Sequence, residues 1–403
     1  MAGLTPAQQA AQKKLAAQKA MNTAFMRYSY DQPIPANAQN GNAYGQALNF
    51  DVPIVAGAFL TRLRVFQNLT VTYTAAATSP TVALNACGQE GAIKEVNVTF
   101  GNKQVTVHPY FISKVFNRAK GRQSLNFGQV LGTESTAVQG ELYSSPTLTA
   151  GANTWKTYYD LPMNLIHPLS VYGILPISGS GTRVQVQVVP AAQFVGPDPL
   201  ENVVNTNGTI TVTGSITVVA YYRDNISMSM INNVQPNLTG LPTAQIIKPQ
   251  EINPLTAGTM VFKRLSNPYP FVKLASLVID GQSSSTFCSA SNITGYEIDK
   301  AENSSSAFIR YDATTGGMLN YFADVRERYQ QDFDDGVIVW DAPSQNTPDS
   351  TLQEGDAYLN LTQNGYPAAR LGFQVGAVST ANNITPRVVT YGIILNSQGI
   401  KIA

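Results

Sequence analysis

Strict alternation of apolar and polar residues is the feature that most limits what this chain can fold into. In the stretch RVQVQVV, Val184, Val186 and Val188 alternate with polar residues, and TITVTGSITVVAYY keeps the same period over residues 209–222. Successive side chains of a β-strand point to opposite faces, so a period of two places the apolar residues on one face. The pattern predicts half-buried strands.

Similar short runs recur along the chain, separated by segments rich in Gly, Pro and Asn. In EVNVTFGNKQVTV, Gly101 and Asn102 lie between two alternating runs, which predicts a β-hairpin. The run ARLGFQVGAV repeats the pattern through Leu371, Phe373 and Val375. Many short strands joined by such turns are typical of antiparallel sandwiches rather than of a parallel sheet.

A few segments between the strands have helical features. HPYFISKVFNRAKGR places Pro109 at the first turn of a predicted helix, and DPLENVVN begins with a capping box from Asp198 to Glu201. The strongest prediction is GGMLNYFADVRERYQQDF, which runs directly into the strand GVIVWDAP. Its apolar residues at helical spacing are Met318, Phe322, Val325 and Tyr329.

The 403 residues are enough for two domains of common size. The Pro-rich stretch NNVQPNLTGLPTAQIIKPQEINP, residues 232–254, separates two strand-rich halves, and we place the boundary near residue 243. The predicted organisation is an N-terminal basic helix and arm over residues 1–45, a first sandwich over 46–243 and a second over 244–403. The predicted class is all-β, with a few inserted helices.

The N-terminal segment differs from everything after it. LTPAQQAAQKKLAAQKAM is rich in Ala, Gln and Lys, and no acidic residue precedes Asp31. Thr5 is a capping residue and Pro6 suits the first helical position, so a helix is predicted from Ala7 to about Tyr28.

The charged residues of this predicted helix are Lys13, Lys14, Lys19 and Arg27. Its large apolar residues do not form a clean stripe. Two interpretations therefore stay open from the residues alone. One is a solvated tail, and the other is an arm that presents its cations to an anionic surface such as lipid headgroups.

The sequence offers little material for catalysis or for binding a metal or cofactor. The two histidines, His108 and His167, have no Cys, Asp or second His at ligand or triad spacing. Cys87 and Cys288 are far apart and in no metal-binding spacing, and we expect two buried free thiols. The segment DFDDG lacks the acidic twelfth position of a calcium loop, where Pro343 stands. We predict no catalytic residue, metal ligand or cofactor.

Charge and hydropathy exclude further classes. Net charge is +1, so no overall field attracts nucleic acid. Only 13% of the residues are charged, whereas about 25% is usual for soluble domains, which indicates a surface covered by repeated subunit contacts. No apolar run approaches the length of a membrane span, and the N-terminus lacks the apolar region of a secretory signal. The basic cluster from Lys114 to Arg122 is predicted to be a solvated face or a subunit contact rather than a phosphate site.

A cationic N-terminal helix followed by two strand-rich halves, each with its own helix, resembles the double jelly-roll major capsid proteins. The resemblance is greatest to those of tailless, internal-membrane-containing (tectivirus-like) bacteriophages. The segments that carry it are LTPAQQAA, TRVQVQVVPAAQFVGPDPLENV and RERYQQDFDDGVIVWDAP.

The resemblance implies that each half is an eight-stranded jelly roll and that three chains form a pseudo-hexagonal homotrimer. Such trimers would tile an icosahedral virion shell over an internal membrane, after synthesis in the host cytoplasm. The implied partners are further copies of the chain, minor capsid and vertex proteins, and lipid, which Lys13, Lys14, Lys19 and Arg27 would face. No sequence-specific contact with nucleic acid is implied. Residues 133–153 and 344–356 are candidates for outward-facing loops or lattice contacts.

Two other classes of function compete with this one. A β-sandwich spike or surface protein could bind carbohydrate or a receptor, using Trp155, Trp340 and the tyrosines as a platform. A jelly-roll hydrolase or cupin-like enzyme would need clustered histidines or paired carboxylates on a sheet face, and the sequence offers neither.

Overall fold

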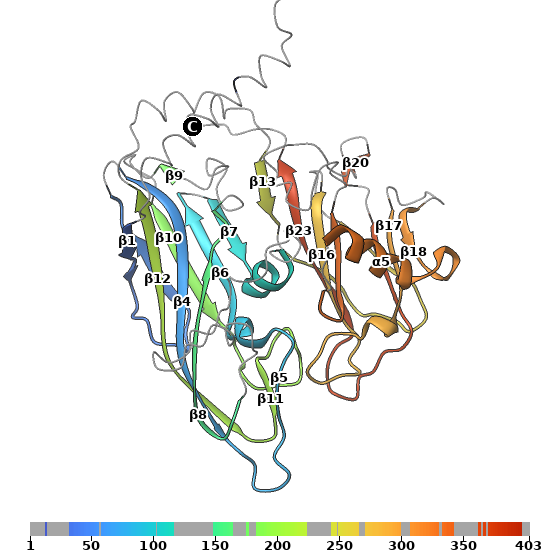
Figure 1. The fold of residues 1–403 in the computed structure, drawn as a ribbon, viewed down its shortest axis with the longest axis horizontal. Helices are drawn as coiled ribbons and strands as arrows, with labels where there is room; N and C mark the ends of the chain where they lie inside the picture. The colour runs from blue at the N-terminus through green and yellow to red at the C-terminus, as the bar shows by residue number, and fades with distance from the viewer. Residues whose placement is uncertain are drawn as a thin grey trace, which may run out of the picture.

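The computed structural model shows two β-sandwiches side by side (Figure 1). It describes residues 13, 32–55, 58–101, 103–116, 148–163, 175–176, 183–223, 243–247, 249–265, 271–299, 307–329, 333–341, 362–363, 366–367 and 370–396.

The first sandwich is built from two antiparallel sheets. One has the order β1-β12-β4-β8, and the other contains β3-β10-β6-β7. Their bounds are β1 Gln32–Pro35, β3 Leu48–Val52, β4 Phe59–Thr74, β6 Ile93–Phe100, β7 Lys103–Val107, β8 Gly151–Asp160, β10 Val184–Pro190 and β12 Thr209–Arg223. Short strands extend these sheets or pair separately: β2 Asn37–Ala38, β5 Val82–Leu84, β9 Leu175–Pro176 and β11 Val204–Thr206.

The second sandwich repeats this arrangement. Its sheets contain β13-β23-β16-β19 and β15-β22-β17-β18. Their bounds are β13 Thr243–Ile246, β15 Val261–Arg264, β16 Phe271–Ile279, β17 Ile293–Asp299, β18 Ala307–Tyr311, β19 Val337–Asp341, β22 Arg370–Val375 and β23 Arg387–Asn396. The additional strands are β14 Gln250–Ile252, β20 Thr362–Gln363 and β21 Tyr366–Pro367.

The strand order identifies the fold. When the main strands of each half are numbered in chain order, the sheets are 1-8-3-6 and 2-7-4-5 in both halves. The first strand pairs with the eighth, the second with the seventh, the third with the sixth and the fourth with the fifth. This is the pairing of one long antiparallel hairpin that is rolled into two facing sheets. Each half is therefore an eight-stranded jelly roll, as predicted, although no sequence repeat relates the halves.

The alternating runs occupy the predicted strands. Val184, Val186 and Val188 are buried in β10, and every second residue between them is partly exposed. The predicted hairpin pairs Phe100 with Lys103 across a two-residue turn. Gly101 in this turn has φ 58°, a left-handed conformation that glycine adopts without strain. The period of two correctly identified the core-facing side chains.

A helical segment follows the fifth main strand in both jelly rolls. These segments are η2 (Phe111–Phe116) and α5 (Met318–Tyr329), and shorter turns occur at η1 (Gly88–Ala92), η5 (Ala290–Asn292) and η6 (Ala313–Thr315). The α5 prediction is confirmed, with Met318, Val325 and Tyr329 buried. Tyr321, rather than the predicted Phe322, completes the buried face, and Phe322 is only partly buried.

Two segments differ from prediction. DPLENVVN is a single turn and not a helix, because Val203 and Val204 are needed in the core and β11 begins at Val204. The predicted N-terminal arm is shorter, since Gln32–Pro35 form the edge strand β1 of the first jelly roll. Proline is tolerated at a sheet edge, where its missing N–H costs no ladder bond. The boundary near residue 243 stays a prediction, because residues 224–242 lie outside the described part.

One contiguous cluster of buried apolar residues includes strands of both jelly rolls. A smaller cluster lies beneath the far ends of β4 and β8 in the first jelly roll. Cys87 and Cys288 are both buried free thiols, as predicted. In Figure 1, η2 lies between the two sandwiches, so this helical segment forms part of their contact.

Candidate functional site: the junction between the jelly rolls

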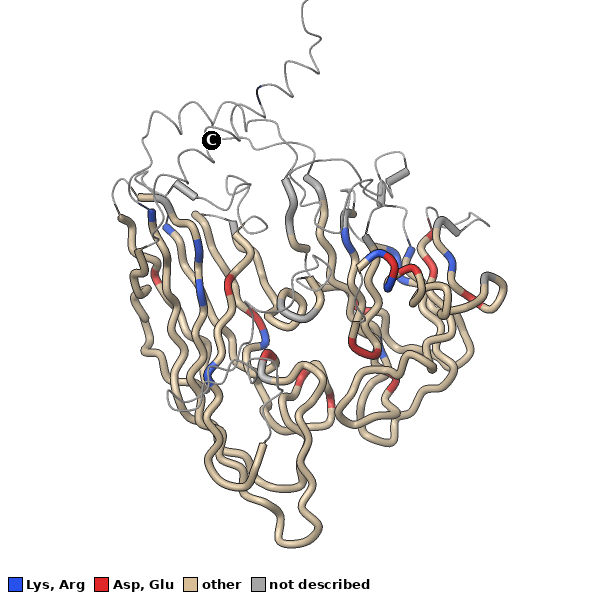
Figure 2. The backbone as a smooth tube through the Cα atoms, in the orientation of Figure 1, with Lys and Arg blue, Asp and Glu red and all other residues tan. Residues whose placement is uncertain are grey.

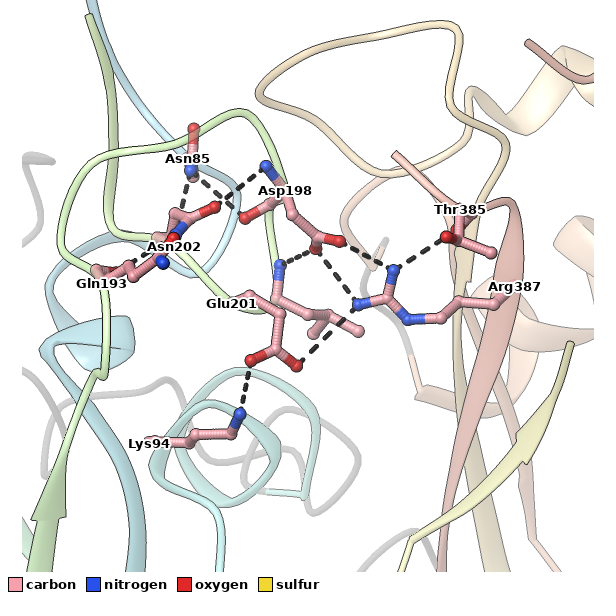
Figure 3. Close-up of polar contacts among 9 residues, drawn as sticks. Asn85, Lys94, Gln193, Asp198, Glu201, Asn202, Thr385 and Arg387 are labelled. Atoms are coloured by element: carbon pink, nitrogen blue, oxygen red, sulfur yellow. Dashed lines mark hydrogen bonds and ion pairs between the residues drawn. The ribbon is translucent and has the colours of Figure 1, made fainter. Parts of the chain in front are cut away.

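A buried ion pair crosses the junction between the two jelly rolls (Figure 3). Arg387, the first residue of β23, donates from Nη1 to Asp198 Oδ2 at 2.7 Å and from Nη2 to Asp198 Oδ1 at 3.2 Å. The same Nη1 also donates to the carbonyl of Thr385 at 3.3 Å. A two-point contact between guanidinium and carboxylate fixes orientation as well as distance, so this pair sets how β23 lies against the first jelly roll.

The turn that was predicted to begin a helix positions the carboxylate. Asp198 Oδ1 accepts the backbone N–H of Leu200 at 3.0 Å, and the Asp198 carbonyl accepts the N–H of Asn202 at 2.9 Å. Asn85 donates from Nδ2 to the carbonyls of Gly196 at 3.1 Å and Asn202 at 3.0 Å. These hydrogen bonds fix the turn on the side opposite Arg387, so the orientation of the Asp198 carboxylate is set by contacts within the first jelly roll.

The network continues through a second carboxylate. Glu201 Oε1 lies 4.0 Å from Arg387 Nη2, and Glu201 Oε2 pairs with Lys94 Nζ. Burial by itself would lower the pKa of Arg387, but the hydrogen bond and charge of Asp198, helped by Glu201, raise it, so the guanidinium stays charged. Its side chain is only 8% exposed. Removing one partner of such a pair leaves an uncompensated buried charge, which costs about 3–5 kcal/mol.

Aromatic rings from the η2 region form the second part of the junction. The rings of Phe111 and Tyr391 stack with centroids 5.0 Å apart and planes 12° apart. The ring of His108 meets Tyr391 edge-on at 5.0 Å, and Tyr110 donates its hydroxyl to Asp334 Oδ2 at 3.3 Å. The contact therefore combines apolar stacking with polar anchoring.

A loop contact forms the third part. The N–H of Ala86 donates to the Ser285 carbonyl at 2.8 Å, and Asn205 Nδ2 donates to the Ser284 carbonyl at 2.7 Å. Since Asn205 belongs to β11 and Ala86 follows β5, this small strand pair of the first jelly roll docks directly on the second. Three separate groups of contacts thus restrain rotation of one jelly roll against the other.

The residues singled out from sequence have varied positions. Burial lowers the pKa of His108, whose Nδ1 lies 3.3 Å from the Lys94 carbonyl, and this histidine is a packing residue. Trp155 and Trp340 are 1% and 7% exposed, so neither presents an open ring face for a sugar. Within the described residues, no group of three or more His, Cys, Asp or Glu is placed to hold a metal ion.

Of the predicted membrane-facing cations, Lys13 is exposed and has helical backbone. Lys14, Lys19 and Arg27 lie outside the described residues, as do His167 and the cluster from Arg118 to Arg122. The structure describes only residues 148–153 of the two predicted outward loops, and β8 begins at Gly151. In the described part of the chain, no helix is both long enough and apolar enough to cross a bilayer.

Sequence reasoning missed Arg387. Its signal was a single cation opening the otherwise uncharged strand RVVTYGIILN. A charge at the end of a core strand needs a partner in the folded protein, but nothing in the sequence points to Asp198, 189 residues away.

Comparison with solved structures identifies the class of fold. The chain is similar to the STIV MCP, with a TM-score of 0.57 and 11% identity over 91% of this chain and 97% of that one. It is similar to the PBCV-1 virus capsid protein, with a TM-score of 0.56 and 12% identity over 91% and 93%. The Faustovirus major capsid protein has a TM-score of 0.54 and 10% identity over 91% and 90%.

The chain has the double jelly-roll fold, and the sequence-based resemblance is confirmed at the level of the fold. No protein-family model matches the sequence. No curated protein matches it either.

Proposed function

We propose that this chain is a major capsid protein, which self-assembles as pseudo-hexagonal homotrimers to form an icosahedral virion shell. The observation that carries the proposal is the repetition of one strand order in two jelly rolls held side by side. Three such chains around a threefold axis supply six similar sandwiches, which is the outline needed to tile a surface with near-hexagonal symmetry.

The rigidity of the junction supports this role. A tiling unit must keep its two sandwiches at a constant angle, because each copy repeats that angle around the threefold axis. The Arg387–Asp198 pair, the stacked Phe111 and Tyr391 rings and the β5–β11 contact restrain the angle at three places. A protein that worked by hinge motion would not need a buried ion pair in this position.

The scarcity of charged residues at one end of the first jelly roll also supports the proposed capsid function. No charged residue occurs between Arg64 and Glu90 or between Glu201 and Arg223. In Figure 2 the lower end of the first jelly roll, where the far ends of β4 and β12 lie, shows no charged residue. Interfaces between subunits are depleted of charge at their centres, so contacts between neighbouring copies account for this surface.

The finer elements of the proposal concern location and partners. The protein would act in the capsid shell, with minor capsid and vertex proteins as neighbours, and no catalytic step or cofactor is required. The basic N-terminal helix would face an internal membrane through Lys13, Lys14, Lys19 and Arg27. The tailless, membrane-containing bacteriophages are the viral group that the sequence resembles.

The oligomeric state of the purified full chain tests the proposal. We expect a stable trimer by analytical ultracentrifugation and a near-hexagonal outline by negative-stain electron microscopy. A monomer that binds glycans on an array would instead favour the carbohydrate-binding spike. The buried Trp155 and Trp340 argue against that alternative.

A further inference from the structure

Two acidic side chains lie next to each other on the outer face of the second jelly roll. Glu297 and Asp299 are two residues apart on β17, so both point away from the core that Tyr296 and Ile298 face. Both are buried all the same, with Glu297 9% and Asp299 1% exposed. Two carboxylates that close together, with little water, repel one another and cannot both ionise at low cost.

The nearby cations compensate only one carboxylate of this pair at hydrogen-bond distance. Arg370 Nη2 bonds to Asp299 Oδ2 at 2.5 Å. Arg310 Nε bonds to Asp312 Oδ2 at 2.6 Å, whereas it lies 3.7 Å from Glu297 Oε2. Among the residues that the structure describes, Glu297 therefore has no cation at hydrogen-bond distance, since Arg310 lies 3.7 Å away.

The strand register gives Glu297 an apolar neighbour as well. Its cross-strand partner on β22 is Gly372, and the next residue in the same row is Phe262 on β15. The Phe262 ring covers Gly372 so closely that an added Cβ there would lie 2.6 Å from the ring. The Phe262 ring therefore lies over Gly372, in the same cross-strand row as Glu297.

One oxygen of the pair is left without a donor. Asp299 Oδ1 is buried and accepts no hydrogen bond from any residue that the structure describes. A protonated Glu297 can fill this need, since its O–H can donate to the Asp299 carboxylate. Arg370 already bonds to Asp299 at 2.5 Å, whereas Arg310 lies 3.7 Å from Glu297, so we assign the proton to Glu297.

We propose that Glu297 and Asp299 form a proton-binding site that holds one shared proton in mild acid and releases it as the pH rises through neutrality. Within the described part of the chain, the charged groups that face this site are Arg264 of β15, Arg310 of β18, Arg370 of β22 and, after β18, Asp312. Proton release leaves two adjacent buried carboxylates, of which only Asp299 has a cation, Arg370, at hydrogen-bond distance, and this destabilises the sheet β15-β22-β17-β18. The second jelly roll is therefore more stable in mild acid than in mild alkali.

The pKa of Glu297 agrees with this arrangement. Burial, followed by the hydrogen bond and charge of Asp299, raises it from the ordinary value to about 7. In the unfolded chain a glutamate titrates near pH ~4.3. Between the unfolded and folded pKa values, the folded state binds this proton and the unfolded state does not. The free energy of unfolding is therefore largest below the unfolded pKa and decreases as the pH rises through the folded pKa.

Two measurements on the full chain test the proposal. With 13Cδ-labelled glutamate, the NMR titration of Glu297 should have its midpoint near neutral pH, and in Asp299→Asn it should move at least one unit lower. In urea, the unfolding constant should rise about tenfold or more between pH 5.5 and pH 8. Glu297→Gln, which mimics the protonated form, should remove most of that rise.

Glu327→Gln is the matched control, because Glu327 is an exposed residue of α5 in the same jelly roll. This variant should keep the rise in the unfolding constant. A Glu297 midpoint near the value of an exposed glutamate would overturn the proposal, as would an equal pH response of the Glu297→Gln and Glu327→Gln variants. If Glu297→Gln fails to fold, the NMR titration of the unmodified chain still decides the question.

Discussion

Arg387 matters because its charge is largely shielded from water, with its side chain only 8% exposed. Its partner Asp198 holds it at two points, and Glu201 lies at 4.0 Å. A contrasting pair exists in the same protein, where Arg183 bonds to Asp51 at 2.8 Å but its side chain is 64% exposed. Exposed pairs contribute little, while breaking a buried pair leaves an unpaired charge in a medium of low polarity. Similar distances therefore predict very different energies.

We expect Arg387→Met to lower the free energy of unfolding by about 3 kcal/mol, because Asp198 loses its main cationic partner. The control Arg183→Met should cost less than about 1 kcal/mol. Urea unfolding followed by tryptophan fluorescence measures both. Adding Asp198→Asn to Arg387→Met should recover part of the loss. Equal effects of the two arginine variants would contradict this account of the junction.

Helix α5 stabilises a strand as well as filling the core. β19 ends the order β13-β23-β16-β19, and its outer edge needs partners for its backbone. The Tyr321 hydroxyl accepts the Val339 N–H at 2.6 Å and donates to the Val339 carbonyl at 3.0 Å. One side chain thus satisfies both backbone groups of an edge residue, which explains why Tyr321 and not Phe322 faces inward.

Tyr321→Phe should destabilise the protein by about 1–3 kcal/mol, since a buried N–H and a buried C=O lose their partner. Hydrogen exchange at the Val339 amide should become faster, and this effect is local to β19. Tyr311→Phe serves as the control, because its hydroxyl donates at 2.7 Å to Asp324, which is exposed. Unchanged protection of Val339 in Tyr321→Phe would show that the edge does not depend on this hydroxyl.

At the scale of the whole molecule, the two jelly rolls share one contiguous core cluster and differ in what their outer surfaces carry. The first ends in an uncharged lobe, whereas the second carries the carboxyl pair Glu297 and Asp299 on its outer sheet. β1 begins at Gln32, so residues 1–30 precede the first strand of the first jelly roll. The proposed membrane role of the N-terminal helix can therefore be tested without removing a strand.

Deletion of residues 1–30 should leave trimers intact and impair assembly on anionic lipid vesicles. Each Lys or Arg near an anionic surface contributes about 1 kcal/mol, and many copies in a shell act together. A variant with Lys13, Lys14, Lys19 and Arg27 changed to Gln keeps the length and isolates the charge. Vesicle flotation measures how much of each variant, the deletion and the Gln substitution, binds to lipid. Normal recovery of the truncated protein on vesicles would show that the arm is dispensable.

The sequence by itself determined the period of the strands, the faces they bury, the position of α5 and the division into two similar halves. The period, the buried faces and the helix depend on residues that are close together in the sequence, and the division depends on the Pro-rich stretch 232–254. It could not determine that DPLENVVN ends after one turn, that Arg387 meets Asp198, or that Phe262 covers the row beside Glu297. The alternation of apolar and polar residues indicates which face of a strand a side chain occupies, but not which residues of other strands it contacts. Those partners are set by strand order and register, which only the folded jelly rolls decide.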